Sequence, residues 1–129
     1  MTTIKLTRTG REPLQFDGSL IGRATSITGE KRSHTLAVYQ TKGGKLVASI
    51  EYNSSWSREH NTGHADHFGT WQDVVAFFGA YNAAADVTGF PPGDQFSAKE
   101  AAEKRAVFDA YDDALSRLCE ALGWAEILD

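Results

Sequence analysis

The spacing of the apolar residues changes once along this chain, close to Thr70, and this single change restricts the fold more than any other feature. Before Thr70 the apolar residues fall in short runs separated by turn residues, which is typical of strands. After Thr70 they recur every three or four residues, as on the buried face of a helix. Strand-rich residues 1–69 are therefore expected to precede helical residues 70–129.

The first strands are predicted on both sides of a turn pair. Residues 3–8 (TIKLTR) are rich in β-branched side chains, and residues 14–16 form a short apolar run. Asp17-Gly18 then predicts a two-residue hairpin turn, which leads into a strand over residues 20–27.

Gly43-Gly44 marks the clearest hairpin. The pair lies between the strand-like runs HTLAVYQ and KLVASIEYN. Glycine accepts the positive φ angles that a two-residue hairpin turn needs. A loop of two residues would set Tyr39 opposite Ala48 across the two strands.

Two helices are marked by their first residues. In FGTWQDVVAFFG, Thr70 is placed to accept a hydrogen bond from an early N–H group, and Asp73 falls in the first turn, where an acidic side chain is favourable. The second helix is predicted to begin with the capping box SAKE at Ser97 and to end at Gly123. Its apolar stripe is expected to pack within the same molecule rather than in a coiled coil.

This order of elements predicts the fold class. Strands followed by helices, without βαβ alternation, indicate an α+β fold in a single domain, residues 1–129. We expect an antiparallel sheet of four to five strands followed by two C-terminal helices packed on one face. The other face would be left to solvent or to a partner.

Composition and charge exclude several classes of protein. The longest strongly apolar run, VVAFF, is far shorter than the roughly 20 residues of a membrane-spanning helix, and no signal-peptide pattern opens the chain. The single cysteine, Cys119, cannot form an internal disulfide, which favours a cytoplasmic protein. The net charge of −4 is too small to imply a strong nucleic-acid partner. It is unevenly divided, with nine basic and six acidic residues before Thr70 and four basic and eleven acidic residues after it.

The stretch EHNTGHADHFGTW holds three of the four histidines. On a helix, His60, His64 and His67 would share one face, where three imidazoles could bind Zn²⁺. However, residues 61–63 (NTG) are typical of a turn, and glycine costs about 1 kcal/mol inside a helix. On a strand, His64 and His67 would point to opposite faces. The sequence therefore leaves two interpretations of this stretch. One is a metal-binding protein or metal-dependent enzyme, and the other is a solvated loop followed by an edge strand.

Binding of a macromolecule is the interpretation we favour. The loop before the histidines carries tryptophan and arginine, which often anchor protein interfaces, although the tryptophan could also fold back over the sheet edge. The predicted binding residues are Trp56, Arg58, His60, His64, Lys42 and Lys45.

A nucleic-acid interface is a further alternative. If the basic residues of the first half share a sheet face with Tyr39 and Tyr52, single-stranded nucleic acid could stack there. The acidic helical half would repel phosphate unless it faced away.

Other enzyme signals are weak. Cys119 lies beside the apolar stripe of the last helix, which favours a structural thiol over a nucleophile. The sequence KGGK at residues 42–45 lacks the spacing of a phosphate-binding loop and turns a hairpin instead of opening a helix. We therefore expect a binding protein rather than an enzyme.

Two regions resemble known families. The terminal WAEILD, after FDGSLIGR and AVYQTKGGKLVA, resembles the small bacterial EXLDI proteins, and this resemblance implies no activity. AVYQTKGGKLVASIEYN followed by FGTWQDVVAFFGA is similar to small phage anti-CRISPR proteins, which act by binding host complexes. The sequence thus predicts a small non-enzymatic protein that acts through protein–protein interaction. The most specific version of this prediction is a phage or mobile-element inhibitor of a host complex, such as an anti-CRISPR protein.

Overall fold

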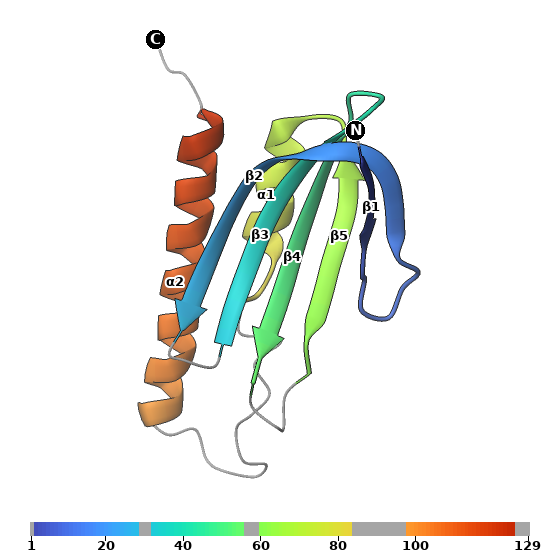
Figure 1. Ribbon diagram of the computed structural model, residues 1–129. Coiled ribbons are helices and arrows are strands. Elements are labelled where there is room, and N and C mark those ends of the chain that lie inside the picture. The colour runs from blue at the N-terminus through green and yellow to red at the C-terminus, as the bar shows by residue number, and fades with distance from the viewer. Residues whose placement is uncertain (1, 29–31, 56–59, 84–97, 126–129) are drawn as a thin grey trace.

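A computed structural model of the chain describes residues 2–28, 32–55, 60–83 and 98–125. Five strands precede two helices (Figure 1). The elements are β1 (Thr2–Leu6), β2 (Leu14–Thr28), β3 (Arg32–Thr41), β4 (Leu46–Ser54), β5 (Thr62–Phe68), α1 (Trp71–Ala80) and α2 (Ala98–Leu122). The predicted α+β fold, an antiparallel sheet followed by two C-terminal helices, is confirmed.

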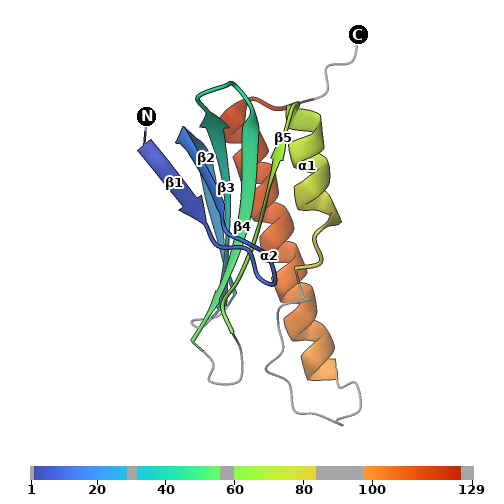
Figure 2. The same ribbon diagram turned by 90° about the vertical axis from the view of Figure 1, so that its right-hand side faces the viewer.

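The sheet joins the strands in chain order, β1-β2-β3-β4-β5, and every neighbouring pair is antiparallel. β2 has 15 residues and pairs with two strands over different lengths. Residues 14–18 pair with β1 and residues 18–28 pair with β3, with a bulge between Leu20 and Gly22. A bulge bends and twists its strand. The β1–β2 hairpin accordingly leaves the sheet on the side away from the helices, which we call the outer face (Figure 2).

The predicted turn at Asp17-Gly18 is wrong, because both residues lie inside β2. The connection between β1 and β2 lies at residues 7–13 instead. Asp17 pairs with Thr3 on β1, whose hydroxyl donates to Asp17 Oδ1 at 2.7 Å. A Cβ atom on Gly18 would collide with the backbone carbonyl of Gln40 on β3. Glycine is needed here for close approach of two strands where β2 bends, and not for a turn.

The β3–β4 hairpin forms where Gly43-Gly44 predicts it, but its loop has three residues instead of two. The Thr41 N–H donates to the Lys45 carbonyl at 2.8 Å, and the Lys45 N–H donates to Thr41 Oγ1 at 3.0 Å. Of the two glycines only Gly44 has a positive φ, 89°. The closing pair therefore leaves one more residue in the loop than a two-residue turn allows.

The longer loop shifts the two strands by one residue. Tyr39 lies opposite Val47, so the predicted pairing of Tyr39 with Ala48 is wrong. Ala48 instead lies opposite Val38, and both are buried against the helices. Because side chains alternate between the two faces, this shift decides which residues share a core.

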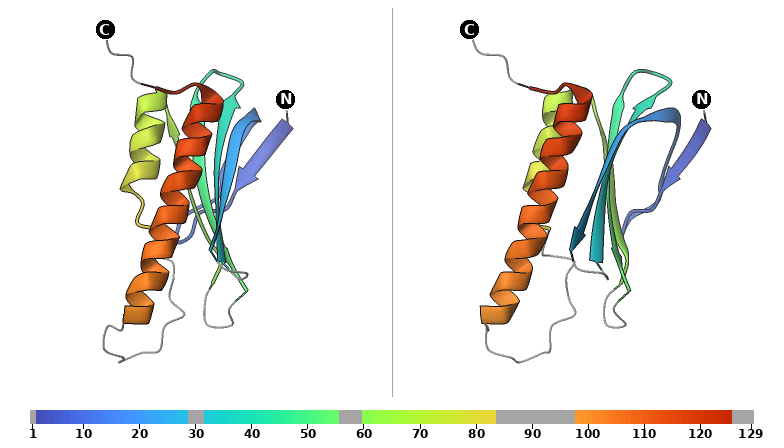
Figure 3. Two further views of the ribbon diagram at one scale, coloured as in Figure 1. Left: turned by 90° about the vertical axis from the view of Figure 1, so that its left-hand side faces the viewer. Right: turned by 60° about the vertical axis from the view of Figure 1, so that its left-hand side comes forward.

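Both helices pack on one face of the sheet, as predicted (Figure 3). α1 begins after the N-cap Thr70, whose Oγ1 accepts from the Asp73 N–H at 3.2 Å. This cap confirms the first predicted helix start. α1 packs on β4 and β5, and α2 packs mainly on β2.

α2 ends at Gly123, as predicted. The N–H of Gly123 donates to the Glu120 carbonyl at 3.2 Å, and that of Trp124 donates to the Cys119 carbonyl at 2.9 Å. These two bonds satisfy carbonyls that the end of a helix leaves open. Ser97, the predicted N-cap of α2, lies outside the described residues.

The main core lies between the sheet and the helices, and Phe68 of β5 packs against its buried residues. Its buried members are Ala24, Leu36, Val38, Ala48, Ile50, Tyr52, Val74, Phe78, Ala83, Val107, Tyr111, Ala114 and Leu118.

A second, smaller core lies on the outer face, under the β1–β2 hairpin. Its buried residues are Leu6 of β1, Val47 of β4 and Ala65 of β5. The partly buried residues packed against them are Ile4, Leu14, Phe16 and Tyr39. The expectation that the outer face is left to solvent or to a partner is therefore wrong for this half of the sheet. The bend in β2 folds the chain's own first hairpin over it.

Candidate interaction surface

The histidine-rich stretch forms β5 instead of a helix, and its side chains alternate between the two faces. His64 lies opposite Ile50 and contacts the ring of Tyr81, 5.2 Å away between centroids. His67 lies opposite Val47, on the outer face. His60 precedes the strand. The structure therefore separates His64 from His67, and the described residues contain no group of three or more His, Cys, Asp or Glu that could hold a metal ion.

The predicted binding residues are spread over both ends of the sheet. Lys42 and Lys45 are exposed in the β3–β4 turn, next to the β4 end that pairs with Phe68. His60 lies beyond the opposite end of β5. Trp56 and Arg58 lie outside the described residues. The structure thus does not bring the two lysines together with His60.

The two tyrosines proposed as a stacking platform lie on opposite faces. Tyr52 is completely buried in the main core. Tyr39 lies on the outer face, where its ring meets the edge of Phe16 with centroids 5.6 Å apart. Burial raises the pKa of Tyr39, and the nearby carboxylate of Glu51 adds to this effect. Tyr52 therefore cannot present a base-stacking surface beside Tyr39.

A buried histidine that sequence reasoning did not consider joins the sheet to both helices. His34 is 1% exposed and is surrounded by the rings of Tyr52, Tyr81 and Tyr111, with centroids 4.7, 5.8 and 5.8 Å away. The Tyr111 hydroxyl donates to the Phe78 carbonyl at 2.7 Å, and burial raises the pKa of Tyr111. The alternation of the β3 sequence, which places position 34 on the same side as Leu36 and Val38, could have revealed it. This cluster packs the layers together.

Cys119 is half-buried beside the stripe of α2 and forms no disulfide. Burial raises the pKa of its thiol. A raised pKa disfavours the thiolate that a nucleophile needs. The surroundings of Cys119 therefore agree with the predicted structural thiol and disfavour a nucleophile.

Exposed apolar side chains collect on β2. Leu20, Ile21 and Ile27 are 49%, 39% and 70% exposed. They are three of the four large hydrophobic residues that are exposed in the described part of the chain; the fourth is Phe108 on α2. We call Leu20, Ile21 and Ile27 the β2 patch. Leu20 and Ile21 are neighbours in the chain, whereas Ile27 lies further along the same strand, roughly 20 Å away at about 3.3 Å per residue.

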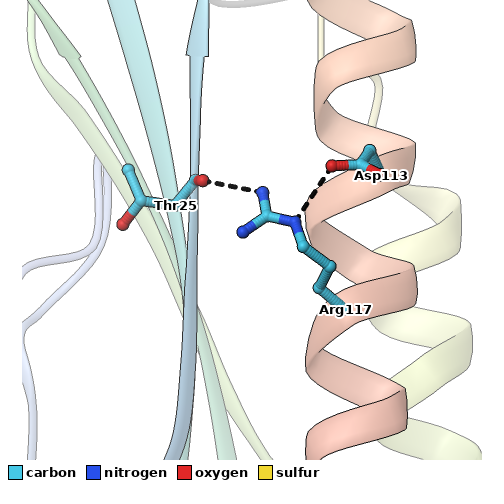
Figure 4. Close-up of polar contacts among 3 residues, drawn as sticks. All are labelled: Thr25, Asp113 and Arg117. Atoms are coloured by element: carbon cyan, nitrogen blue, oxygen red, sulfur yellow. Dashed lines mark hydrogen bonds and ion pairs between the residues drawn. The ribbon is translucent and has the colours of Figure 1, made fainter.

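The β2 patch lies along an open edge of the sheet. β1 pairs with β2 only as far as Gly18, so residues 19–28 have a described strand, β3, on one side only. On the other side, Arg117 of α2 donates from Nη2 to the Thr25 carbonyl at 3.0 Å (Figure 4). Arg117 is itself held by Asp113, with 2.9 Å between Nε and Oδ2. The arginine therefore occupies one backbone acceptor of this edge.

The end of the outer face beyond the β1–β2 hairpin contains an open hollow of about 390 Å³. Ile27 of the β2 patch lines it, and all of the other lining residues are polar. The lining residues are Ile27, Arg32, Ser33, Asn53, Ser54, Ser55 and Asn61. An apolar residue next to a polar hollow resembles the composition of a protein interface, in which an apolar centre is surrounded by a polar rim.

Comparison with known proteins gives no family. No family model, curated protein or solved structure matches the chain. Neither described helix is long and apolar enough to cross a membrane.

Proposed function

We propose that this protein acts by binding another protein through the β2 patch and the open edge beside it. The observation that supports this proposal is that Leu20, Ile21 and Ile27 are exposed on one strand, in the part of β2 beyond Gly18 that has a described strand, β3, on one side only. The finer expectation, an inhibitor of a host complex such as an anti-CRISPR protein, stays a prediction.

The energetics favour an apolar contact at this position. Complete burial of an isoleucine side chain stabilises by about 1.5–3 kcal/mol, and Ile27 is still 70% exposed, so most of this gain remains to be made in a complex. Residues buried at the centre of an interface contribute most of the binding energy. Arg23, which is exposed between the apolar residues, would supply orientation and selectivity.

Affinity capture from the natural host with matched variants tests this function. The wild-type protein is expected to retain a stoichiometric protein partner, and Ile27→Asp is expected to lose it because a charge replaces the most exposed apolar side chain of the β2 patch. Phe108→Asp is the control, since it places the same charge on the exposed large hydrophobic residue that the described part of the chain has outside the β2 patch. Thermal unfolding should show that both variants are folded. Equal retention of the partner by wild type and Ile27→Asp would contradict the proposal.

A further inference from the structure

The backbone geometry of β2 defines what can attach to its open edge. In an antiparallel sheet the N–H and C=O groups of alternate residues point to the same side. The Thr25 carbonyl meets Arg117 on the side away from β3, so the backbone groups of Arg23 and Ile27 point outward as well. The side chains between them, Ala24 and Ser26, are buried toward the helices. Arg23, Thr25 and Ile27 therefore share both the edge and the outer face.

We propose that an extended segment of a partner protein binds as a sixth strand, antiparallel to β2, along residues 21–27. This inference rests on the proposed function and states how the partner is recognised. Backbone hydrogen bonds to the outward groups of β2 would provide attachment, and alternate side chains would provide selectivity.

The side chains of the edge specify the partner sequence. Ile27 lies at one end of the segment and favours an apolar residue opposite it, and Ile21, the exposed residue of the bulge at the other end, favours a second apolar residue close to it. Arg23 is exposed between them and favours an acidic residue, while Thr25 accepts a polar one. An antiparallel partner, followed from its N-terminus, therefore begins opposite Ile27 and ends opposite Ile21. Its seven residues have the pattern apolar, any, polar, any, acidic, any, apolar, in which the polar residue lies opposite Thr25 and the acidic one opposite Arg23.

A second copy of this chain does not fit the same edge. α2 packs mainly on β2, the strand that carries the edge (Figures 1 and 3). Paired strands lie about 4.8 Å apart, whereas packed helices need about 8–10 Å between their axes. Two copies joined through β2 would bring their α2 helices too close. An extended segment carries no helix at this position and avoids the clash.

Arg117 protects the edge until the partner binds. Its guanidinium group occupies the Thr25 carbonyl, which would accept instead from the N–H of the partner residue opposite Thr25 when a strand is added. The side chain is 51% exposed and its ion pair with Asp113 lies at the surface, so it can move into solvent. A cationic side chain at an open edge is also a common protection against unwanted strand pairing.

Titration with synthetic peptides tests the proposal. The probe is a fluorescein-labelled seven-residue peptide with the pattern given above, measured by anisotropy. We expect it to bind, and we expect N-methylation of the peptide amides that face β2 to weaken binding by about tenfold or more, because this removes hydrogen bonds and keeps the side chains. Exchanging the acidic residue for lysine should weaken binding, and the Arg23→Glu protein should restore it.

A variant of the protein provides the complementary test. Arg23→Pro removes one outward N–H, leaves the ladder to β3 intact, and follows a glycine, which tolerates a following proline. It should bind the peptide about tenfold more weakly than Arg23→Ala. No binding of the unmethylated peptide, or equal binding of the N-methylated one, would overturn strand addition. Loss of the natural partner in Ile27→Asp alongside full retention in Arg23→Pro would likewise overturn it, while leaving the protein-binding function standing.

Discussion

The backbone groups at the β5 edge and at the open β2 edge of the sheet have different hydrogen-bond partners. At β5, both backbone groups of Gly63 bond to Thr9, which donates its N–H at 2.7 Å and accepts at its Oγ1 at 2.9 Å. Further along the strand, the His67 N–H donates to Asp66 Oδ1 at 2.8 Å. At β2, one exposed arginine bonds to one carbonyl. The difference indicates that the chain's own residues 7–9 close part of the β5 edge, whereas the described residues leave most of the β2 edge beyond Gly18 without a neighbouring strand.

The largest expected contrast comes from placing the same charge at each edge. Ala65→Asp puts a carboxylate into the small core of the outer face, where Ala65 is 3% exposed, and should destabilise the protein by about 3 kcal/mol or more. Ile27→Asp should change the free energy of unfolding by less than about 0.5 kcal/mol, because the side chain is already in solvent. Urea unfolding measures both. If the two variants lost similar amounts of unfolding free energy, the proposed difference between the two edges would be contradicted.

A methyl group at the β5 edge should have the next largest effect. A Cβ atom on Gly63 would collide with the backbone carbonyl of Thr7, so Gly63→Ala should lower stability by about 2 kcal/mol. Gly69→Ala is the control, since a Cβ atom there meets nothing within 4 Å. Thermal unfolding compares the two variants. If Gly63→Ala were as stable as the control, residues 7–9 would not be fixed against β5.

Removing one hydroxyl tests the hydrogen bonds that close the β5 edge. Thr9→Val keeps the shape of the side chain but removes the acceptor for the Gly63 N–H, which should cost about 1 kcal/mol. Amide hydrogen exchange at Gly63 should become faster. Thr9→Ser keeps the hydroxyl and should preserve the protection. Unchanged exchange in Thr9→Val would show that Thr9 does not seal this edge.

The smallest effect on stability is expected at the β2 edge. Arg117→Ala removes a half-exposed ion pair and one hydrogen bond, and should lower the free energy of unfolding by less than about 0.5 kcal/mol. The same variant should bind the strand peptide several-fold more tightly, because the carbonyl of Thr25 no longer has to be released. Chemical unfolding and anisotropy provide the two values. A loss of stability above about 1 kcal/mol would mean that Arg117 is a structural clasp like Thr9.

The sequence predicts the layers of this fold well because local signals determine them. The change of apolar spacing at Thr70 and the capping hydroxyl of that residue correctly predict the order of the elements and the start of α1. The alternation of β5 correctly places His64 and His67 on opposite faces. These features depend on neighbours within a few residues.

The sequence does not predict the features that depend on distant contacts. Asp17-Gly18 carries a turn signal, yet Gly18 is needed because the backbone of Gln40 lies against it. The register of the β3–β4 hairpin depends on one additional residue in its loop, where the Thr41 hydroxyl accepts a hydrogen bond from the Lys45 N–H. The β2 patch was also missed, because the apolar residues of a strand reveal neither where its neighbour ends nor which of them stay exposed.

The most direct test of the account is amide hydrogen exchange, followed by NMR, in the protein alone and saturated with the strand peptide. We predict that the Arg23 and Ile27 amides exchange rapidly in the protein alone and become protected in the complex, while the Gly63 amide is protected in both states. Protection of the β2 edge amides before the peptide is added, or no change in them at saturation, would contradict the claim that this edge is the binding site.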